Sequence, residues 1–289
     1  MAPTSTSLSA GTPETNASKQ AKNLPYIPNP VKEALARNEL TYAFTVKLLR
    51  SIEAVQIAQT AGYNSILIDL EHAPLTLEQT GQMCLAALAR DMCPIVRIPQ
   101  LERHWISRTL DIGALGILVP HIKTVEEVRR VVSYSRFQPI GERSAVAGLP
   151  HLRYKSYPVA EANKACNEAT LVIVMIETLE ALEIVEEIAQ VPGVDQLLIG
   201  TNDLTAEMGI PGQYDNPRLT EAYQRVINAA QANGLSVGIG GLASRSDLVA
   251  KFARMGARFV MAATDQPLLS AAAAKNAAEM KQLGESLTL

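Results

Sequence analysis

Short apolar runs alternate with longer helical stretches along nearly the whole chain, and this alternation restricts the folds open to it. The runs are continuous and rich in β-branched residues, as in strands buried on both faces. Several helical stretches end at a glycine, namely Gly62, Gly234 and Gly256. The runs are 41–47, 65–70, 93–98, 116–120, 172–177, 196–200, 236–240 and 258–264. Eight strand–helix units predict an α/β fold, the (β/α)8 or TIM barrel.

The rest of the chain supports a single barrel domain over 25–289. The main alternative, an open doubly wound sheet, is disfavoured because no G-x-G-x-x-G motif follows the first run. Residues 1–24 are rich in Ser, Thr, Ala and Pro, which predicts a disordered tail. An Ala-rich helix over about 267–285 is expected to pack closely, against another subunit. The long connection 135–170 is expected to be a lid, a binding loop or an interface.

Composition excludes several classes of partner. The 289 residues carry a net charge of −3 and only 4% aromatic residues, so we expect no nucleic acid partner. No apolar run reaches the roughly 18 residues of a membrane span, so we expect no membrane partner. The three cysteines form no C-x-x-C pair, which indicates a reducing compartment, and we expect a cytoplasmic protein. They are Cys84, Cys93 and Cys166.

Polar and ionisable side chains cluster at the carboxyl ends of the predicted strands, where TIM barrels carry their active sites. A charge at the end of a buried strand needs a partner, a ligand or a metal ion. The residues at or just beyond these ends are Lys47, Asp69, Arg97, His121, Glu177, Asp203 and Thr264. This clustering predicts an active site at that end of the barrel.

Glu177 and Asp203 follow two successive strands and can therefore reach one point. Two close carboxylates repel unless a cation lies between them, and Mg²⁺ or Mn²⁺ prefers such oxygen ligands. The alternative is that each carboxylate pairs with a separate Arg or Lys.

Asp69, His72 and Arg97 suggest proton transfer and anion binding. A carboxylate beside an imidazole fixes its tautomer and raises its basicity, so His72 is a candidate general base. A histidine in a loop is otherwise simply solvated. Arg97 could form a salt bridge with Asp69, or it could bind a substrate carboxylate or stabilise an enolate oxygen.

Two further positions are ambiguous from the sequence. His121 either supports the site or is structural. The main chain around 201–203 forms a turn before a helix-like segment and could bind a carboxylate, although Asn202 is also a common turn former.

Taken in order, several motifs resemble the HpcH/HpaI aldolase family, over about residues 40 to 275. They are DLEHAP at 69–74, VRIP at 96–99, MIET at 175–178, VPGVD at 191–195 and IGTNDL at 199–204. The resemblance implies a metal-dependent (class II) pyruvate aldolase on a TIM barrel. It implies that Glu177 and Asp203 bind Mg²⁺, alternatively Mn²⁺ or Co²⁺.

The resemblance also implies roles for the neighbouring residues. Arg97 would stabilise the enolate oxygen, and His72 with Asp69 would form the acid–base pair. The small 2-oxo acid would contact Arg97 and the substrate-binding residues Gly200, Asn202, Asp203 and His121.

The implied reaction is cleavage or formation of 4-hydroxy-2-oxo acids through a metal-bound pyruvate enolate. The loop sequence Pro139–Ser144 and the Gly200–Asp203 segment depart from the bacterial pattern and look more like fungal members. That leaves oxaloacetate decarboxylation through the same enolate as an alternative, and a non-catalytic binding barrel as a second. The resemblance further implies a homo-oligomer, a hexamer built from dimers that exchange a C-terminal helix.

Overall fold

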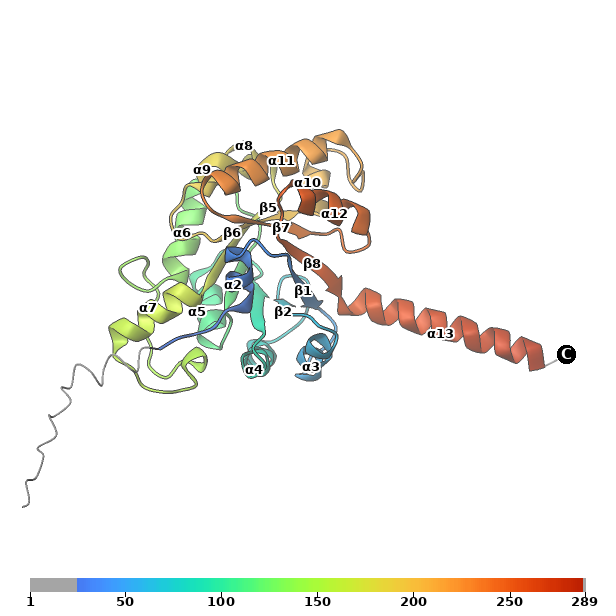
Figure 1. Cartoon of the computed structure of the whole chain (residues 1–289), viewed down its shortest axis with the longest axis horizontal. Coiled ribbons are helices and arrows are strands. Elements are labelled where there is room, and N and C mark those ends of the chain that lie inside the picture. Colours follow the sequence, from blue (N-terminus) through green and yellow to red (C-terminus); the bar gives the residue numbers. More distant parts are fainter. Residues whose placement is uncertain (1–24, 288–289) are drawn as a thin grey trace, which may run out of the picture.

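The fold is a closed barrel of eight parallel strands in the order of the sequence, β1 to β8, which confirms the predicted TIM barrel (Figure 1). The computed structural model describes residues 25–287, so the predicted disorder of 1–24 lies outside the described residues. The strands are β1 (Thr41–Val46), β2 (Ser65–Asp69), β3 (Cys93–Arg97), β4 (Gly116–Val119), β5 (Leu171–Ile176), β6 (Gln196–Gly200), β7 (Ser236–Gly240) and β8 (Phe259–Thr264).

Helices follow every strand and surround the barrel. Capping boxes begin two of them, Thr76 with Gln79 at α4 and the predicted Thr124 with Glu127 at α6. The helices are α2 (Pro30–Ala36), α3 (Glu53–Thr60), α4 (Leu77–Leu88), α5 (Arg103–Asp111), α6 (Val125–Ser135), η1 (Pro150–Leu152), α7 (Val159–Ala169), α8 (Leu179–Glu183), α9 (Val185–Ala189), α10 (Thr201–Glu207), α11 (Pro217–Ala232), α12 (Ser246–Met255) and α13 (Asp265–Leu287).

Alternate strand residues divide the core into two apolar clusters. Those pointing outward pack under the helices, and those pointing inward fill the barrel, which is therefore a packed core. The inward group includes Leu67, Ile95, Leu118, Ile173, Leu198 and Phe259. Ile27 and Val31, at the N-terminal segment and α2, belong to the same inner cluster and close the amino-terminal end of the barrel. The carboxyl end, where TIM barrels carry their active sites, is not closed by this cluster.

The connection between α6 and β5 contains η1 and α7 and is anchored at the amino-terminal side of the barrel. Arg136 is buried and donates to the carbonyl oxygens of Asn167, Thr170 and Gly193 and to the carboxylate of Asp195. Leu149 belongs to the inner cluster, together with parts of α7. These anchors therefore hold both ends of the segment at the side of the barrel opposite the carboxyl ends of the strands.

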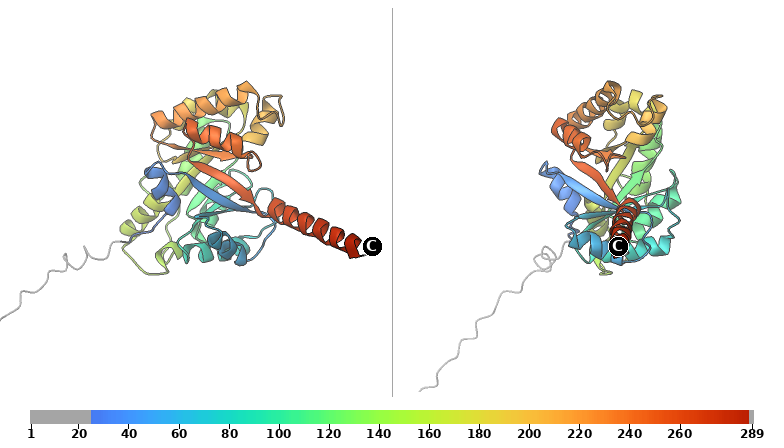
Figure 2. Two further views of the ribbon diagram at one scale, coloured as in Figure 1. Left: turned by 45° about the vertical axis from the view of Figure 1, so that its right-hand side comes forward. Right: turned by 90° about the vertical axis from the view of Figure 1, so that its right-hand side faces the viewer.

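Helix α13 begins on the barrel and then extends away from it (Figures 1 and 2). The buried Asp265 carboxylate accepts hydrogen bonds from the main-chain N–H groups of Lys47, Leu48 and Leu49, which ties the start of the helix to the end of β1. Beyond Asp265 the described helix is exposed, so it packs on its own chain only at its start, and the predicted packing against another subunit stays a prediction. Among residues 25–287, no helix is long and apolar enough to cross a membrane.

Candidate active site

The centre of the carboxyl-end cluster is a buried ion pair between neighbouring strands. Asp69 ends β2 and Arg97 ends β3, and the two residues are register partners. Arg97 donates from Nε to Asp69 Oδ1 at 3.0 Å and from Nη2 to Oδ2 at 2.6 Å. Lys47 Nζ lies 3.2 Å from the same Oδ2. Burial alone would raise the pKa of Asp69, but the hydrogen bonds and charges of Arg97 and Lys47 hold that pKa below its ordinary value.

Glu71 links this pair to both histidines. Its Oε2 lies 2.9 Å from Arg97 Nη1, and its Oε1 lies 2.7 Å from His121 Nε2. The imidazole of His72 is within 3.6 Å of Glu71 Oε2. Glu71 was not among the predicted site residues, although it lies inside the DLEHAP motif at 69–74. The signal was the strand alternation, because Glu71 continues the inward series of Leu67 and Asp69.

The expected direct pairing of Asp69 with the His72 imidazole is not among the contacts of the described residues. Asp69 Oδ1 instead accepts hydrogen bonds from the main-chain N–H groups of Glu71 and His72, at 3.1 and 3.3 Å. The imidazole is half exposed, and its nearest carboxylate is that of Glu71. Asp69 therefore shapes the turn that carries His72, and Glu71 stands beside the ring.

Glu177 follows β5 and is buried, with 1% of its surface exposed. Its Oε1 accepts a hydrogen bond from the main-chain N–H of His121 at 2.7 Å and lies 3.3 Å from the His121 Nδ1. Burial raises the pKa of Glu177, and the charges of Asp203 and Glu71 raise it further, while His121 opposes the change. His121 thus bridges two carboxylates, with a left-handed backbone (φ 58°) that directs its N–H into the site.

Asp203 stands in the first turn of α10, directly after β6, and is exposed. A Cβ at Gly200 would collide with the carboxylate and the Cβ of Glu177, so Glu177 lies directly over the main chain that leads into α10. Asn202 accepts a hydrogen bond from the Tyr214 hydroxyl at 2.7 Å. Within residues 25–287, neither Glu177 nor Asp203 forms a salt bridge with a Lys or Arg, so the alternative of separate basic partners is not observed.

The charges at this end of the barrel are unbalanced. Four carboxylates of the site face two permanently basic side chains, so acidic groups outnumber these basic ones. The carboxylates are those of Asp69, Glu71, Glu177 and Asp203, and the basic side chains are Lys47 and Arg97. A divalent cation between Glu177 and Asp203 would balance the excess, and carboxylate oxygens suit Mg²⁺ or Mn²⁺. The residues present therefore fit the metal that the motifs implied.

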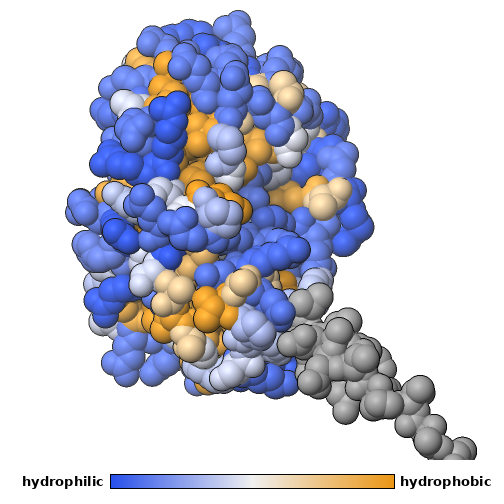
Figure 3. All heavy atoms as spheres, turned by 90° about the vertical axis from the view of Figure 1, so that its left-hand side faces the viewer, coloured by the Kyte–Doolittle hydropathy of each residue, from blue (hydrophilic) through white to orange (hydrophobic). Residues whose placement is uncertain are grey.

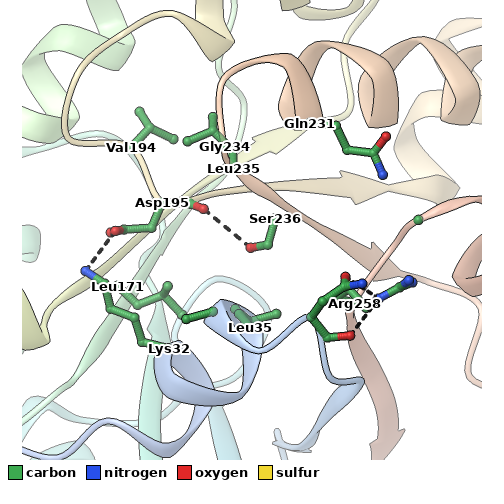
Figure 4. A pocket seen from close by; sticks show the side chains of 13 residues that line it. Lys32, Leu35, Leu171, Val194, Asp195, Gln231, Gly234, Leu235, Ser236 and Arg258 are labelled. Atoms are coloured by element: carbon green, nitrogen blue, oxygen red, sulfur yellow. Dashed lines mark hydrogen bonds and ion pairs between the residues drawn. The ribbon is translucent and has the colours of Figure 1, made fainter.

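A cavity of about 180 Å³ opens beside these residues. Its lining includes Lys47, His72, Arg97, Met175, Gly200, Thr201, Asn202, Asp203, Gly240, Gly241, Ala243, Met261 and Thr264. A larger cavity of about 270 Å³ lies at the opposite end of the barrel, where Lys32 pairs with Asp195 (Figure 4). We assign the site to the smaller cavity because Lys47, His72, Arg97 and Asp203 of the ionisable cluster line it, at the carboxyl ends of the strands.

The chain belongs to the HpcH/HpaI aldolase/citrate lyase family, whose model matches residues 48–272. It is a carbon–carbon lyase of the aldolase class, in a family of metal-dependent class II aldolases.

Named relatives agree with this assignment. A 4-hydroxy-4-methyl-2-oxoglutarate aldolase of Chaetomium globosum is 33% identical over 90% of this chain and 98% of its own length. A 4-hydroxy-2-oxovalerate aldolase of Rhodococcus jostii is 34% identical over 89% and 98%. Among solved structures, macrophomate synthase matches with a TM-score of 0.74 at 26% identity, over 93% of this chain and 99% of its own.

Proposed function

We propose that this enzyme cleaves 4-hydroxy-2-oxo acids to pyruvate and a carbonyl compound. The observation that carries the proposal is the pair Glu177 and Asp203, two carboxylates that influence each other and have no Lys or Arg partner among the described residues, beside a buried Arg97. A divalent cation held there would polarise the C2 keto oxygen of a 2-oxo acid as a Lewis acid. Mg²⁺ is the proposed ion, with Mn²⁺ or Co²⁺ as alternatives.

Arg97 is the proposed stabiliser of the enolate oxygen. Its Nε and Nη2 donate to Asp69, and its Nη1 faces Glu71, which hold the guanidinium plane in one orientation. A guanidinium carries more N–H groups than these contacts use, so donors remain for a developing oxyanion. Because Arg97 also lines the cavity, those donors are already placed before substrate binds.

His72 is the proposed acid–base group. As the C3–C4 bond breaks, its imidazole accepts the C4 hydroxyl proton through a water molecule and C4 becomes the carbonyl carbon of the released product. The electrons of the broken bond form the C2=C3 bond of the enolate, whose charge rests on the C2 oxygen, and the protonated imidazole then returns the proton to C3 through water. Asp69 positions the main chain of His72 by accepting its N–H, and the carboxylate of Glu71 lies beside the His72 imidazole. Gly200, Asn202, Asp203 and His121 are the proposed contacts of the 2-oxo acid.

The decisive test is a metal-reconstituted panel of 2-oxo acids in which pyruvate and CO₂ are measured in the same samples. We expect pyruvate from 4-hydroxy-2-oxo acids, loss of activity with a chelator, and no activity in Glu177→Gln or Asp203→Asn. CO₂ from oxaloacetate with little aldol cleavage would favour a decarboxylase, an alternative supported by the likeness to macrophomate synthase. Metal binding without turnover of either substrate would refute both.

We also propose that the enzyme is a homo-oligomer in the cytoplasm. Helix α13 extends away from the barrel after its first turn, and the side chains of Tyr42 on β1 and Ile57 on α3 are exposed. Helix α13 itself exposes Leu268, Leu269 and Met280. An α13 helix from a second copy would cover exposed apolar side chains of this kind, and further apolar patches for contacts between dimers lie on the face that Figure 3 views. The proposed assembly is a hexamer.

A further inference from the structure

We propose that Lys47 selects substrates that carry a second carboxylate on the C4 side, so that 4-hydroxy-2-oxo diacids are preferred to their monoacid counterparts. This inference rests on the proposed function, since it concerns the same cavity. Lys47 follows β1, lines the cavity and is 28% exposed at its side chain. It therefore presents a positive charge to whatever fills the cavity.

The Lys47 ammonium is not needed to bury Asp69. Both oxygens of Asp69 already accept a hydrogen bond from Arg97, and Oδ1 also accepts from two main-chain N–H groups. Lys47 adds one contact of 3.2 Å to Oδ2, its only ion pair among the described residues. An ammonium has further N–H donors, and these are free to meet a carboxylate in the cavity.

The position of Lys47 in the barrel suits the far end of a substrate. In a closed barrel of eight strands β1 lies across from β5, so Lys47 lies across the mouth from Glu177. A 2-oxo acid held on the Glu177 side would direct its C4 substituent toward β1.

Apart from Lys47, the cavity lining has few groups that could bind a second carboxylate of the substrate. On the β7 and β8 side it consists of Gly240, Gly241, Ala243, Met261 and Thr264, none of which is charged. The other permanently basic group of the lining, Arg97, is held by Asp69 and Glu71. Lys47 is therefore the group best placed to neutralise a second carboxylate.

The test compares Lys47→Met with wild type on a matched substrate pair, 4-hydroxy-4-methyl-2-oxoglutarate and 4-hydroxy-2-oxovalerate. We expect the ratio of kcat/KM for the diacid over the monoacid to fall about 10- to 100-fold, mostly through KM, as for loss of a charged hydrogen bond. Methionine keeps the apolar stem of lysine. Lys47→Arg should restore most of the ratio.

Lys32→Met is the matched control. Lys32 is also an ion-paired lysine of similar exposure, 31%, but it lies on Asp195 at the opposite end of the barrel (Figure 4). Its substitution should leave the ratio at the wild-type value. An equal fall for both substrates in Lys47→Met would show that Lys47 only supports Asp69 and Arg97 and would overturn the proposal, as would an unchanged ratio.

A binding measurement separates this proposal from the proposed function. Calorimetry of the Mg²⁺-loaded protein would compare 2-oxoglutarate with 2-oxopentanoate, neither of which has the C4 hydroxyl needed for cleavage. Tighter binding of 2-oxoglutarate to wild type, lost in Lys47→Met, supports the role of Lys47 even if no substrate is cleaved. Equal affinity of wild type for the two acids, or binding of neither, refutes it.

Discussion

Arg97 is the side chain whose removal should affect the chemistry most directly after the metal ligands. Arg97→Ala removes the proposed donors to the enolate oxygen, so we expect kcat/KM to fall on the order of 10²–10³, as for an oxyanion-hole donor. Arg97→Lys should recover only part of the loss, because an ammonium cannot reproduce the planar contacts with Asp69 and Glu71. Steady-state kinetics with saturating metal measures the effect, and near-wild-type turnover of Arg97→Ala would contradict the role.

Glu71 is expected to act through its neighbours. It lies against Arg97 and His121, so Glu71→Gln should misplace both and lower kcat about 10- to 100-fold, the range for residues that support a metal site. Metal affinity, followed by calorimetry, separates this effect from loss of the cation. A wild-type kcat in Glu71→Gln would contradict the positioning role of Glu71.

His151 gives the protein an acid-sensitive stability that is independent of the active site. Burial lowers its pKa from 6.5 to about 4, although the Ala114 carbonyl that Nε2 contacts opposes this. The unfolded chain binds a proton below pH 6.5 and the folded chain only near pH 4, so stability is full above 6.5 and falls as the pH drops toward 4. The full loss is on the order of 3 kcal/mol.

Urea unfolding at pH 7 and pH 5 checks this. Wild type should lose about 2 kcal/mol more at pH 5 than His151→Gln, which can still donate to Ala114. His104→Gln, at an exposed position, is the control and should behave as wild type.

The site residues that could be predicted from the sequence are those that lie at the predicted ends of strands. The structure brings four such residues together at the carboxyl end of the barrel: Asp69, Arg97, Glu177 and Asp203, each at or just beyond the end of a strand. Their partners were harder to infer, because which oxygen a side chain meets depends on the turn after the strand. Asp69 and His72 illustrate this, since a tight turn brings their main chains together and leaves the imidazole near Glu71.

At the scale of elements, the passage from β6 into α10 places both proposed metal ligands. Gly200 has no side chain, and a Cβ there would displace Glu177. We expect Gly200→Ala to lower metal affinity about 10- to 100-fold while the metal-free protein keeps its melting temperature within a few degrees. Calorimetry and thermal unfolding measure the two quantities. Unchanged metal affinity would show that Glu177 does not bind the cation.

The elements themselves were well predicted, because strands buried on both faces leave a distinct apolar pattern. All eight strands and the capping box at Thr124 were anticipated. The structure of the connection 135–170 was not predicted, because Arg136 anchors it through main-chain carbonyls from distant segments, and no sequence pattern reveals such contacts.

For the whole molecule, α13 should decide the assembly. Ending the chain after Gln266 keeps Asp265 and its contacts but removes the exposed apolar face of the helix. We expect such a chain to sediment as a smaller species than the full-length protein, measured by analytical ultracentrifugation. Leu268→Glu with Leu269→Glu, in the intact helix, should have the same effect. An unchanged sedimentation coefficient in both would place the interface elsewhere.

The contact of Asp265 with the main chain at 47–49 has one more consequence. Asp265, the first residue of α13, accepts hydrogen bonds from the main chain at 47–49, which includes Lys47, the residue proposed above to select the substrate. The positions of α13 and Lys47 are therefore coupled. Helix α13 cannot change its direction unless these three hydrogen bonds break or the main chain at 47–49 moves with it. The proposed subunit contact through α13 and the proposed selectivity of Lys47 therefore depend on the same three hydrogen bonds.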